Sequence, residues 1–230
     1  MKRNWGKYVF EFLSIFVAVT SAFLLNNWNE SRQNRNVELN ILTEISNGLD
    51  KDVNDIRVNM FGHKQGLDAC KYWRELATGK RVDHGEVVLV HYFNIMRDFI
   101  AIQNTSGYES LKSKGLELIS DDSLRYQIIS LYEYEYKMLE KFEEDYSEAQ
   151  FHESYFEGFN AVISPHLEFD SLGTIVGVDT VPFTEVEQKA LLSIIWKVEV
   201  NRNFILKTYS GVEAKIENIQ TRIEAEIREQ

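Results

Sequence analysis

The sequence has a single cysteine, Cys70, among its 230 residues, so an internal disulfide and any metal site built on several cysteines are excluded. Two prolines and twelve glycines are too few for the many tight turns of an all-β sandwich. Hydrophobic residues make up 44% of the chain and aromatic residues 13%, enough for a sizeable core and against intrinsic disorder. A fold without disulfides must be held together by packing.

Motifs of common enzymes are also lacking: there is no phosphate-binding loop, dinucleotide-binding glycine pattern or nucleophile elbow. The five histidines are scattered, and His84 and His91 would share a helix face only if that helix begins before Gly85. Adjacent acids such as Glu143-Glu144-Asp145 point in different directions, which is typical of a solvated helix face. We therefore predict a protein that is not an enzyme and has no cofactor and no metal site.

Charge is divided unevenly along the chain. Residues 1–25 contain Lys2, Arg3 and Lys7 against Glu11 alone, a net charge of +2. Residues 26–230 contain 22 basic and 35 acidic residues, a net charge of −13. So acidic a body repels a phosphate backbone, and we expect no nucleic-acid partner.

One long apolar run, Tyr8–Leu25, contains a single charge, at Glu11. As a helix it would be about 27 Å long, close to the thickness of the hydrocarbon core of a membrane. A cleaved signal peptide would end in small residues, whereas this run ends in Phe23-Leu24-Leu25. Trp5 and Trp28 bracket the run like aromatic residues at a membrane interface. We predict a retained signal-anchor, rather than a cleaved signal or the core helix of a soluble protein.

The positive charges that flank this run predict its orientation. Lys2, Arg3 and Lys7 precede it, whereas only Arg32 and Arg35 follow within twenty residues. The bias favours an N-terminus inside the cytoplasm. The predicted organisation is a cytoplasmic tail of residues 1–7, a transmembrane helix of residues 8–25 and, in a Gram-negative cell, a periplasmic helical-bundle domain of residues 26–230.

Five residues of the predicted span recur at spacings of three and four and share one helix face: Glu11, Ser14, Ala18, Ser21 and Ala22. Small residues let two helices approach closely in lipid, and a carboxyl group among them can find a hydrogen-bond partner. Three roles for Glu11 remain open at this point. It reaches water near the interface, it packs between helices of a homo-oligomer or a membrane-protein partner, or it translocates an ion.

The stretch from Glu11 to Glu30 resembles a family of bacterial single-pass membrane proteins known only as a domain of unknown function. That family shows Gly-Glu, a fourteen-residue apolar stretch and then Asn-Asn-Trp-Asn-Glu. Here Glu11 stands at the family's glutamate, Phe10 replaces the glycine, and Asn26-Asn27-Trp28-Asn29-Glu30 reproduces the membrane-exit motif. Gly107–Tyr136 is similar to a second family segment, Tyr-Glu-x-Leu-Lys-x-x-Gly followed by a helix opening Asp-x-x-Leu-Arg. The resemblance implies a single-pass architecture and brings no established activity.

The apolar rhythm from Ile41 to Met60 and the lack of Gly or Pro before Gly48 predict that the span continues outward as one helix. We expect this helix to end near Gly62 and Gly66. A further helix is predicted near Leu67–Ala77, with a break at Gly79, and a short one from a Ser106–Glu109 capping box to Gly115.

Two longer helices are also predicted. One runs from an Asp83 cap to about Ile102, and its inward candidates are Val87, Val90, His91 and Ile95. The other runs from Asp121 to about Phe151 beside solvated carboxylates, and its inward candidates are Leu124, Ile128, Tyr132, Leu139, Phe142 and Tyr146.

Residues 158–182 lose helical periodicity and predict a small irregular or β-hairpin insertion. A Thr184–Glu187 capping box opens the last helix, and Asn201-Arg202-Asn203 interrupts it as a kink or a polar layer. Its near-heptad, coiled-coil-like stripe comprises Leu191, Ile194, Val198, Ile205, Tyr209, Val212, Ile216, Ile219, Ile223 and Ile227. The predicted fold is mainly α, an N-terminal transmembrane helix that continues into an extended helical bundle.

These features together suggest a non-enzymatic bitopic inner-membrane protein, a scaffold or sensor-like subunit of a membrane complex. Its expected partners are the lipid bilayer and, through the span, a second copy or another membrane protein. The alternative is a subunit of an ion-driven or transport complex that uses Glu11. A third class, a soluble hydrolase with an apolar N-terminal helix, would require a full-length chain that is soluble without detergent.

Overall fold

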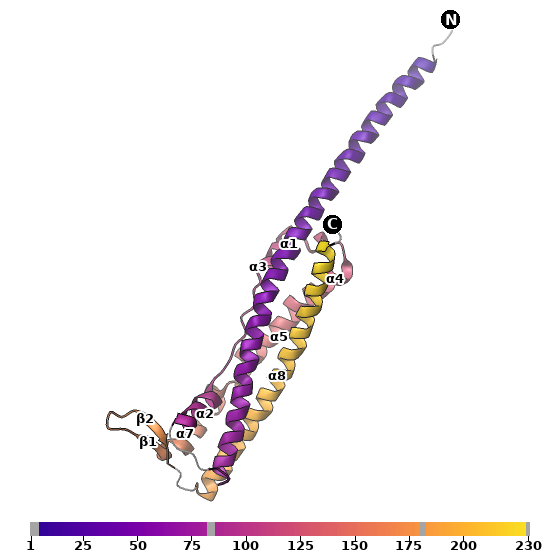
Figure 1. The fold of residues 1–230 in the computed structure, drawn as a ribbon. Coiled ribbons are helices and arrows are strands. Elements are labelled where there is room, and N and C mark those ends of the chain that lie inside the picture. Colours follow the sequence, from indigo (N-terminus) through magenta and orange to yellow (C-terminus); the bar gives the residue numbers. More distant parts are fainter. Residues whose placement is uncertain (1–4, 82–85, 180–182, 229–230) are drawn as a thin grey trace.

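Two long antiparallel helices form the frame of the molecule (Figure 1). A computed structural model describes residues 5–81, 86–179 and 183–228. Helix α1, Trp5–Ala77, has 73 residues, and helix α8, Glu185–Arg228, has 44. The N-terminal part of α1 projects well beyond the end of α8, and the rest of α1 lies against it (Figure 1). The predicted class, mainly α with a long N-terminal helix continuing into a helical bundle, is confirmed.

Shorter elements pack on this pair. They are α2 (Glu86–Met96), α3 (Ser106–Lys114), η1 (Leu116–Leu118), α4 (Asp122–Ser130), η2 (Leu131–Glu135), α5 (Tyr136–Glu140), η3 (Lys141–Asp145), η4 (Ser147–Ala149), α6 (Phe151–Ser154), α7 (Phe156–Ile163), η5 (Ser164–His166), β1 (Leu167–Phe169) and β2 (Ile175–Val178). The core has two clusters along α1. The cluster nearer the N-terminal segment includes Leu42, Leu124 and Tyr209, and the distal one includes Trp73 and Phe159, whose rings meet edge to face at 5.4 Å.

Helix α1 does not end at Gly62 and Gly66, so that prediction was wrong. Both glycines are buried inside the helix, where they make room for other side chains. A Cβ on Gly62 would collide with the Phe99 ring, and one on Gly66 would lie 2.5 Å from the Arg202 guanidinium carbon. The helix stops instead after Ala77, and the predicted break at Gly79 is confirmed by its positive φ of 67°.

Helix α2 ends at Met96, earlier than the predicted Ile102. The predicted cap, Asp83, lies outside the described residues. Residues 97–105 are not helical and form a strap, and the N–H groups of Ala101 and Asn104 in this strap bond to buried side chains of other helices. Helix α2 thus ends before a segment whose backbone hydrogen bonds go to residues distant in sequence, Asp52 and Glu143.

The inward face of α2 was predicted partly in the wrong phase. Val87 and Val90 are exposed, whereas Val88, Tyr92 and the correctly predicted Ile95 are buried. The helix is apolar on nearly every side, so its periodicity does not distinguish one face from its neighbour.

Helix α3 stops as predicted at Gly115, whose φ is +106° and whose N–H donates to the Leu111 carbonyl. The predicted Ser106–Glu109 capping box does not form. Thr105 is the N-cap and makes no side-chain cap hydrogen bond, and the Glu109 carboxylate pairs with Lys112 at 2.6 Å.

Asp121 caps the following helix as predicted, accepting from the Ser123 and Leu124 N–H groups. The helical run ends at Asp145 instead of about Phe151, and it contains two five-residue π segments, η2 and η3. A π turn holds one more residue than an α turn, so each segment rotates the inward face. Of the predicted inward positions in this run, Leu124, Ile128, Tyr132 and Leu139 are buried, Phe142 is partly buried and Tyr146 is exposed.

The predicted hairpin is confirmed: β1 pairs antiparallel with β2, with Leu167 opposite Val178. The first residues of the predicted irregular stretch belong to α7, and residues 180–182 lie outside the described chain. The capping box is confirmed, because the Glu187 carboxylate accepts from the Thr184 N–H at 2.8 Å and the Thr184 hydroxyl from the Glu187 N–H at 3.3 Å.

Helix α8 runs without interruption, so Arg202 forms a buried polar layer instead of a kink. Ile195 is buried where Ile194 was predicted, and Ile227 is partly buried. The other predicted stripe residues are all buried: Leu191, Val198, Ile205, Tyr209, Val212, Ile216, Ile219 and Ile223.

We expect Gly107→Ala to lower the free energy of unfolding by about 1–3 kcal/mol, because backbone atoms cannot move aside as a flexible side chain can. The added Cβ would lie 2.7 Å from the backbone nitrogen of Ile45, at the contact of α3 with α1. Gly211→Ala is the matched control, since nothing lies within 4 Å of that Cβ on α8. It should raise stability by about 0.5–1 kcal/mol. Chemical unfolding followed by circular dichroism measures both, and equal stability of the two variants would contradict the close α1–α3 contact.

Candidate functional site

The N-terminal segment of α1 is long and apolar enough to cross a membrane, and none of it is buried in the protein. The predicted face residues Glu11, Ser14, Ala18, Ser21 and Ala22 are all exposed. The Ser14 hydroxyl donates to the Phe10 carbonyl of the same helix at 2.5 Å. The structure thus brings these five residues to one side of a helix that no other described element covers.

The membrane-exit motif, Asn26–Glu30, is a bare stretch of the same helix. All of its side chains are exposed, and the Arg32 guanidinium lies 5.9 Å from the Trp28 ring centre. The first partly buried side chain is that of Arg35. Residues 26–34 therefore join the apolar segment to the bundle as exposed, uninterrupted helix.

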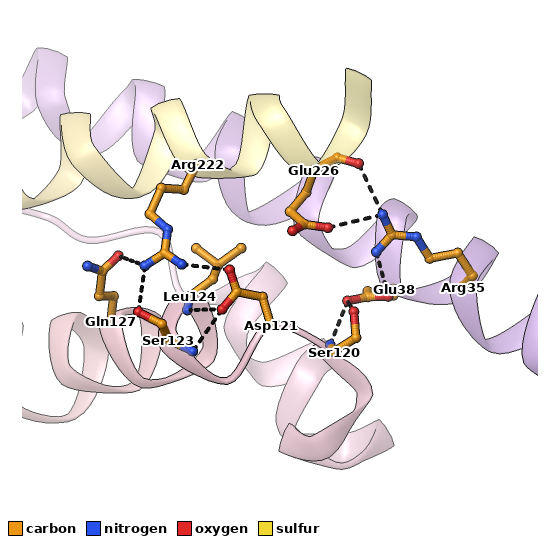
Figure 2. A network of polar contacts seen from close by, with 9 residues as sticks. All are labelled: Arg35, Glu38, Ser120, Asp121, Ser123, Leu124, Gln127, Arg222 and Glu226. Atoms are coloured by element: carbon orange, nitrogen blue, oxygen red, sulfur yellow. Dashed lines mark hydrogen bonds and ion pairs between the residues drawn. The ribbon is translucent and has the colours of Figure 1, made fainter. Parts of the chain in front are cut away.

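The first contacts between α1 and the rest of the bundle are made by Arg35 (Figure 2). Its guanidinium donates to the Glu38 carboxylate at 2.9 Å, to the Glu226 carboxylate at 3.0 Å and to the Glu226 carbonyl at 3.1 Å. Glu226 lies in the last turn of α8. One side chain therefore ties the point where α1 enters the bundle to the end of α8.

Glu38 extends this tie to the turn before α4. It is buried, and its Oε1 atom accepts from the Ser120 N–H at 2.7 Å and from the Ser120 hydroxyl at 2.9 Å (Figure 2). The next residue, Asp121, is the cap of α4. A carboxylate of α1 thereby fixes the position where the next long helix begins.

Arg222 of α8 closes the ring of contacts. It donates to Asp121 at 2.6 Å, to the Ser123 hydroxyl at 2.9 Å and to the Gln127 side-chain oxygen at 2.9 Å (Figure 2). The hydrogen bond from the Leu124 N–H, followed by the Arg222 interaction, lowers the pKa of Asp121. We call these residues the membrane-proximal junction: Arg35, Glu38, Ser120, Asp121, Arg222 and Glu226.

A second polar cluster holds the strap, residues 97–105, against α1. The Asp52 carboxylate accepts from the Asn104 N–H at 2.7 Å and Asp55 accepts from the Ile102 N–H at 2.8 Å. Glu143, from η3, accepts from the Ala101 N–H at 3.0 Å. Carboxylates from two helices thus replace the hydrogen bonds that a helical strap would have made itself.

Arg202 holds the start of the strap from the α8 side. It donates to the carbonyls of Ile95 and Arg97 at 2.9 and 2.8 Å, and it lies 3.2 Å from His63 Nδ1. Burial, then the charge of Arg202, lowers the pKa of His63 to about 3. His63 is therefore neutral at physiological pH and can accept from Arg202.

Glu143 differs from its prediction as part of a solvated carboxylate face, because it is only 4% exposed. The π segment η3 turns it inward, where it also accepts a hydrogen bond from the Tyr209 hydroxyl. Burial raises its pKa to about 7, and the negative charges of Glu144 and Asp55 act in the same direction. Glu143 therefore titrates near neutral pH, and burial also raises the pKa of Asp52.

The chemistry of these clusters is structural hydrogen bonding. Within the described residues, no three His, Cys, Asp or Glu side chains are placed to hold a metal ion. His91 stacks on Tyr72 at 4.1 Å, while His84 lies outside the described residues. Cys70 is fully buried, and burial raises its thiol pKa to about 12. No protein-family model, no curated protein and no solved structure matches the chain.

Sequence reasoning identified Asp121 as a helix cap but missed the rest of the junction. Arg35 and Glu226 are separated by 191 positions, so no local spacing connects them. The sequence offered one signal, an arginine near each end of the bundle's long helices: Arg35 shortly after the apolar run and Arg222 near the end of the last helix.

We expect the free energy of unfolding to depend on pH through Glu143. Its pKa is raised from 4.5 to about 7 in the folded state, so protonated Glu143 favours the folded form. That stabilisation is complete below pH 4.5 and is lost as the pH rises through about 7, a change of roughly 3 kcal/mol. Glu143→Gln should remove this part of the pH dependence.

Unfolding at a series of pH values measures the effect, with Glu140→Gln as the matched control because Glu140 is exposed and its charge is not among those that raise the Glu143 pKa. The control should keep the pH dependence of the unmodified protein. If Glu143→Gln keeps it as well, Glu143 is not the titrating group.

Proposed function

We propose that the protein is a non-enzymatic, single-pass membrane protein that acts as a scaffold or sensor-like subunit of a membrane complex. The observation that carries this proposal is the continuity of α1, one helix from the apolar segment to the far end of the bundle. A continuous helix transmits a rotation or a translation along its axis. A change at the membrane would therefore reach the bundle, and a change in the bundle would reach the membrane.

The membrane-proximal junction supports the coupling. Arg35 and Glu38 fix the entering turn of α1 to α8 and to the cap of α4, so a displaced α1 would strain both contacts. No Gly or Pro lies between the apolar segment and Gly48 to absorb the motion. The motion would pass through residues 26–34, a stretch of exposed helix on which no other described element packs.

The flanking charges support a location in a bacterial inner membrane with the N-terminus in the cytoplasm and the acidic bundle in the periplasm. The resemblance of Glu11–Glu30 to bacterial single-pass proteins supports the same topology. The exposed face of Glu11 and the small residues is the surface through which the span would bind another span.

Spin labels test anchoring and continuity together. We attach them at Val19→Cys and Glu44→Cys, in a Cys70→Ser background in lipid with an excess of unlabelled chain. A straight, unbroken helix between these positions should give one narrow distance of about 38 Å. The first label should be accessible to oxygen in lipid and the second to a water-soluble relaxation agent. An Asn34→Pro variant is the control for a broken helix, and a compartment reporter after Arg228 tests the orientation.

A broad distance distribution without Asn34→Pro would refute rigid coupling. Equal water accessibility of both labels would refute the membrane anchor and favour a soluble protein.

The alternative function is a subunit of an ion-driven or transport complex. It is favoured by one observation, an exposed carboxyl group at Glu11 on the packing face of the span. Glu11→Gln separates the two functions. A transport role predicts that ion flux is lost while the complex still assembles, whereas a packing role predicts altered assembly and no specific loss of flux.

A further inference from the structure

One face of α1 beyond the apolar segment is left uncovered by the bundle. Its residues recur at spacings of three, four or seven, and all are exposed. We call this set the α1 outer stripe: Asn29, Gln33, Asn36, Asn40, Thr43, Asn47, Asn54, Val58 and Phe61.

Contacts on both sides define the edges of the stripe. Toward α8, Asp50 accepts from Gln220 at 2.6 Å, and Arg57 binds Glu213 and Glu217. Toward the strap, a Cβ on Gly48 would lie 3.3 Å from Asn104. The α1 outer stripe is therefore the open surface between two packed sides of the same helix.

The composition of the stripe is unusual for a solvent-facing helix surface, which normally carries charge. Its first seven residues are all uncharged and polar, in a chain with 27% charged residues. Arg32 and Asp50 stand at its edges, and Lys51, at the same angle around the helix as Gln33, is the one charged residue within its arc. The stripe then ends in two large apolar side chains, Val58 and Phe61, which are 58% and 63% exposed. In coiled coils a single Asn at a seam position specifies register at a cost in stability, and the stripe repeats such amides at several positions.

The stripe is in phase with the predicted face of the span. Glu11, Ser14, Ala18 and Ser21 are followed, at spacings of four, by Leu25 and Asn29. From Glu11 to Phe61 this face of α1 is about 75 Å long. At about 100° per residue it lies opposite the side of α1 that packs on the bundle.

We propose that this face binds the same face of a second copy of the chain, so that two parallel α1 helices lie at the centre of a dimer and the bundles lie outside. The parallel orientation rests on the proposed membrane anchor. A two-fold axis along α1 places each stripe residue near its own counterpart. Identical amides can hydrogen-bond to each other, whereas identical charges would repel, and this accounts for the low charge of the stripe, where only Lys51 is charged. An acidic or basic partner would instead require a stripe of the opposite charge.

A rival surface lies on α8, where Trp196, Val200 and Phe204 are exposed beside shallow grooves of about 410 and 320 Å³. Lysines 197 and 207 also line these grooves. This surface has no continuation in the apolar segment. It therefore serves as the control surface.

Disulfide cross-linking of single cysteines in membranes tests the proposal, with the full-length chain in a Cys70→Ser background. The stripe positions are Ala18→Cys, Asn36→Cys and Asn47→Cys. The controls are Lys64→Cys on another side of α1 and Lys207→Cys on α8, all exposed. We expect cross-linked dimer at all three stripe positions, about tenfold above both controls.

A second variant changes stripe residues that are distant from the reporting cysteine at Ala18→Cys. Asn40→Glu with Asn47→Glu places like charges across the axis and should lower cross-linking at Ala18→Cys by about fivefold or more. Lys207→Glu should leave it unchanged. All three substitutions are on exposed positions, so folding is retained.

Cross-linking at Ala18→Cys alone would overturn the proposal, because the spans would then pair without the stripe. Cross-linking at Lys207→Cys alone would overturn it in favour of the α8 surface, and the absence of any cross-linking would overturn it as well, because no second copy would then lie on the stripe. In each case the proposed function stands. Recovery of the chain in the soluble fraction would instead refute the membrane anchor.

Discussion

The antiparallel packing of α8 along α1 is the interaction on which the rest of the structure depends. Arginines of α1 tie the two helices along their shared length, with Arg35 on Glu226, Arg57 on Glu213 and Arg74 on Glu199. Exposed ion pairs contribute little stability individually, so the buried stripes of both helices supply most of it. The ion pairs fix the alignment of one helix along the other. The shorter helices then fill the two apolar clusters on one side of this pair and leave the opposite side of α1 bare.

The strap shows how a polar interior can select a single fold. A continuous α2 would satisfy its own backbone, yet the chain gives up that helix after Met96 and gives its N–H groups to Asp52, Asp55 and Glu143. Buried carboxylates are costly unless they are hydrogen-bonded, and the buried Asp52 and Glu143 each accept a backbone hydrogen bond. Their arrangement is satisfied only when α1, the strap and η3 are all in place. The cluster therefore contributes more to the uniqueness of the packing than to its strength.

Sequence reasoning predicted the features that depend on local chemistry. The continuation of the span, the Asp121 cap, the stops at Gly79 and Gly115 and the Thr184–Glu187 box follow from neighbours in the chain. Gly62 and Gly66 were misread as helix ends because their role, making room for Phe99 and Arg202, involves distant residues. Glu143 was assigned to solvent because a π segment changes the phase that a helical period assumes. That Glu11, Ser14, Ala18, Ser21 and Ala22 share one side of a helix could be read from spacing alone, whereas the junction could not, since its members come from distant parts of the chain.

The exposed helix at residues 26–34 also has an electrostatic consequence. In the proposed membrane orientation the apolar run would end at the edge of the hydrocarbon core, and residues 26–34 would add about 13 Å of helix before the bundle begins. The headgroup layer takes up about 6 Å of this length, so the bundle would stand about one Debye length, roughly 8 Å, beyond the headgroups. Salt would then weaken the repulsion between the −13 charge of the body and anionic lipids, which a bundle lying directly on the headgroups would experience at close range.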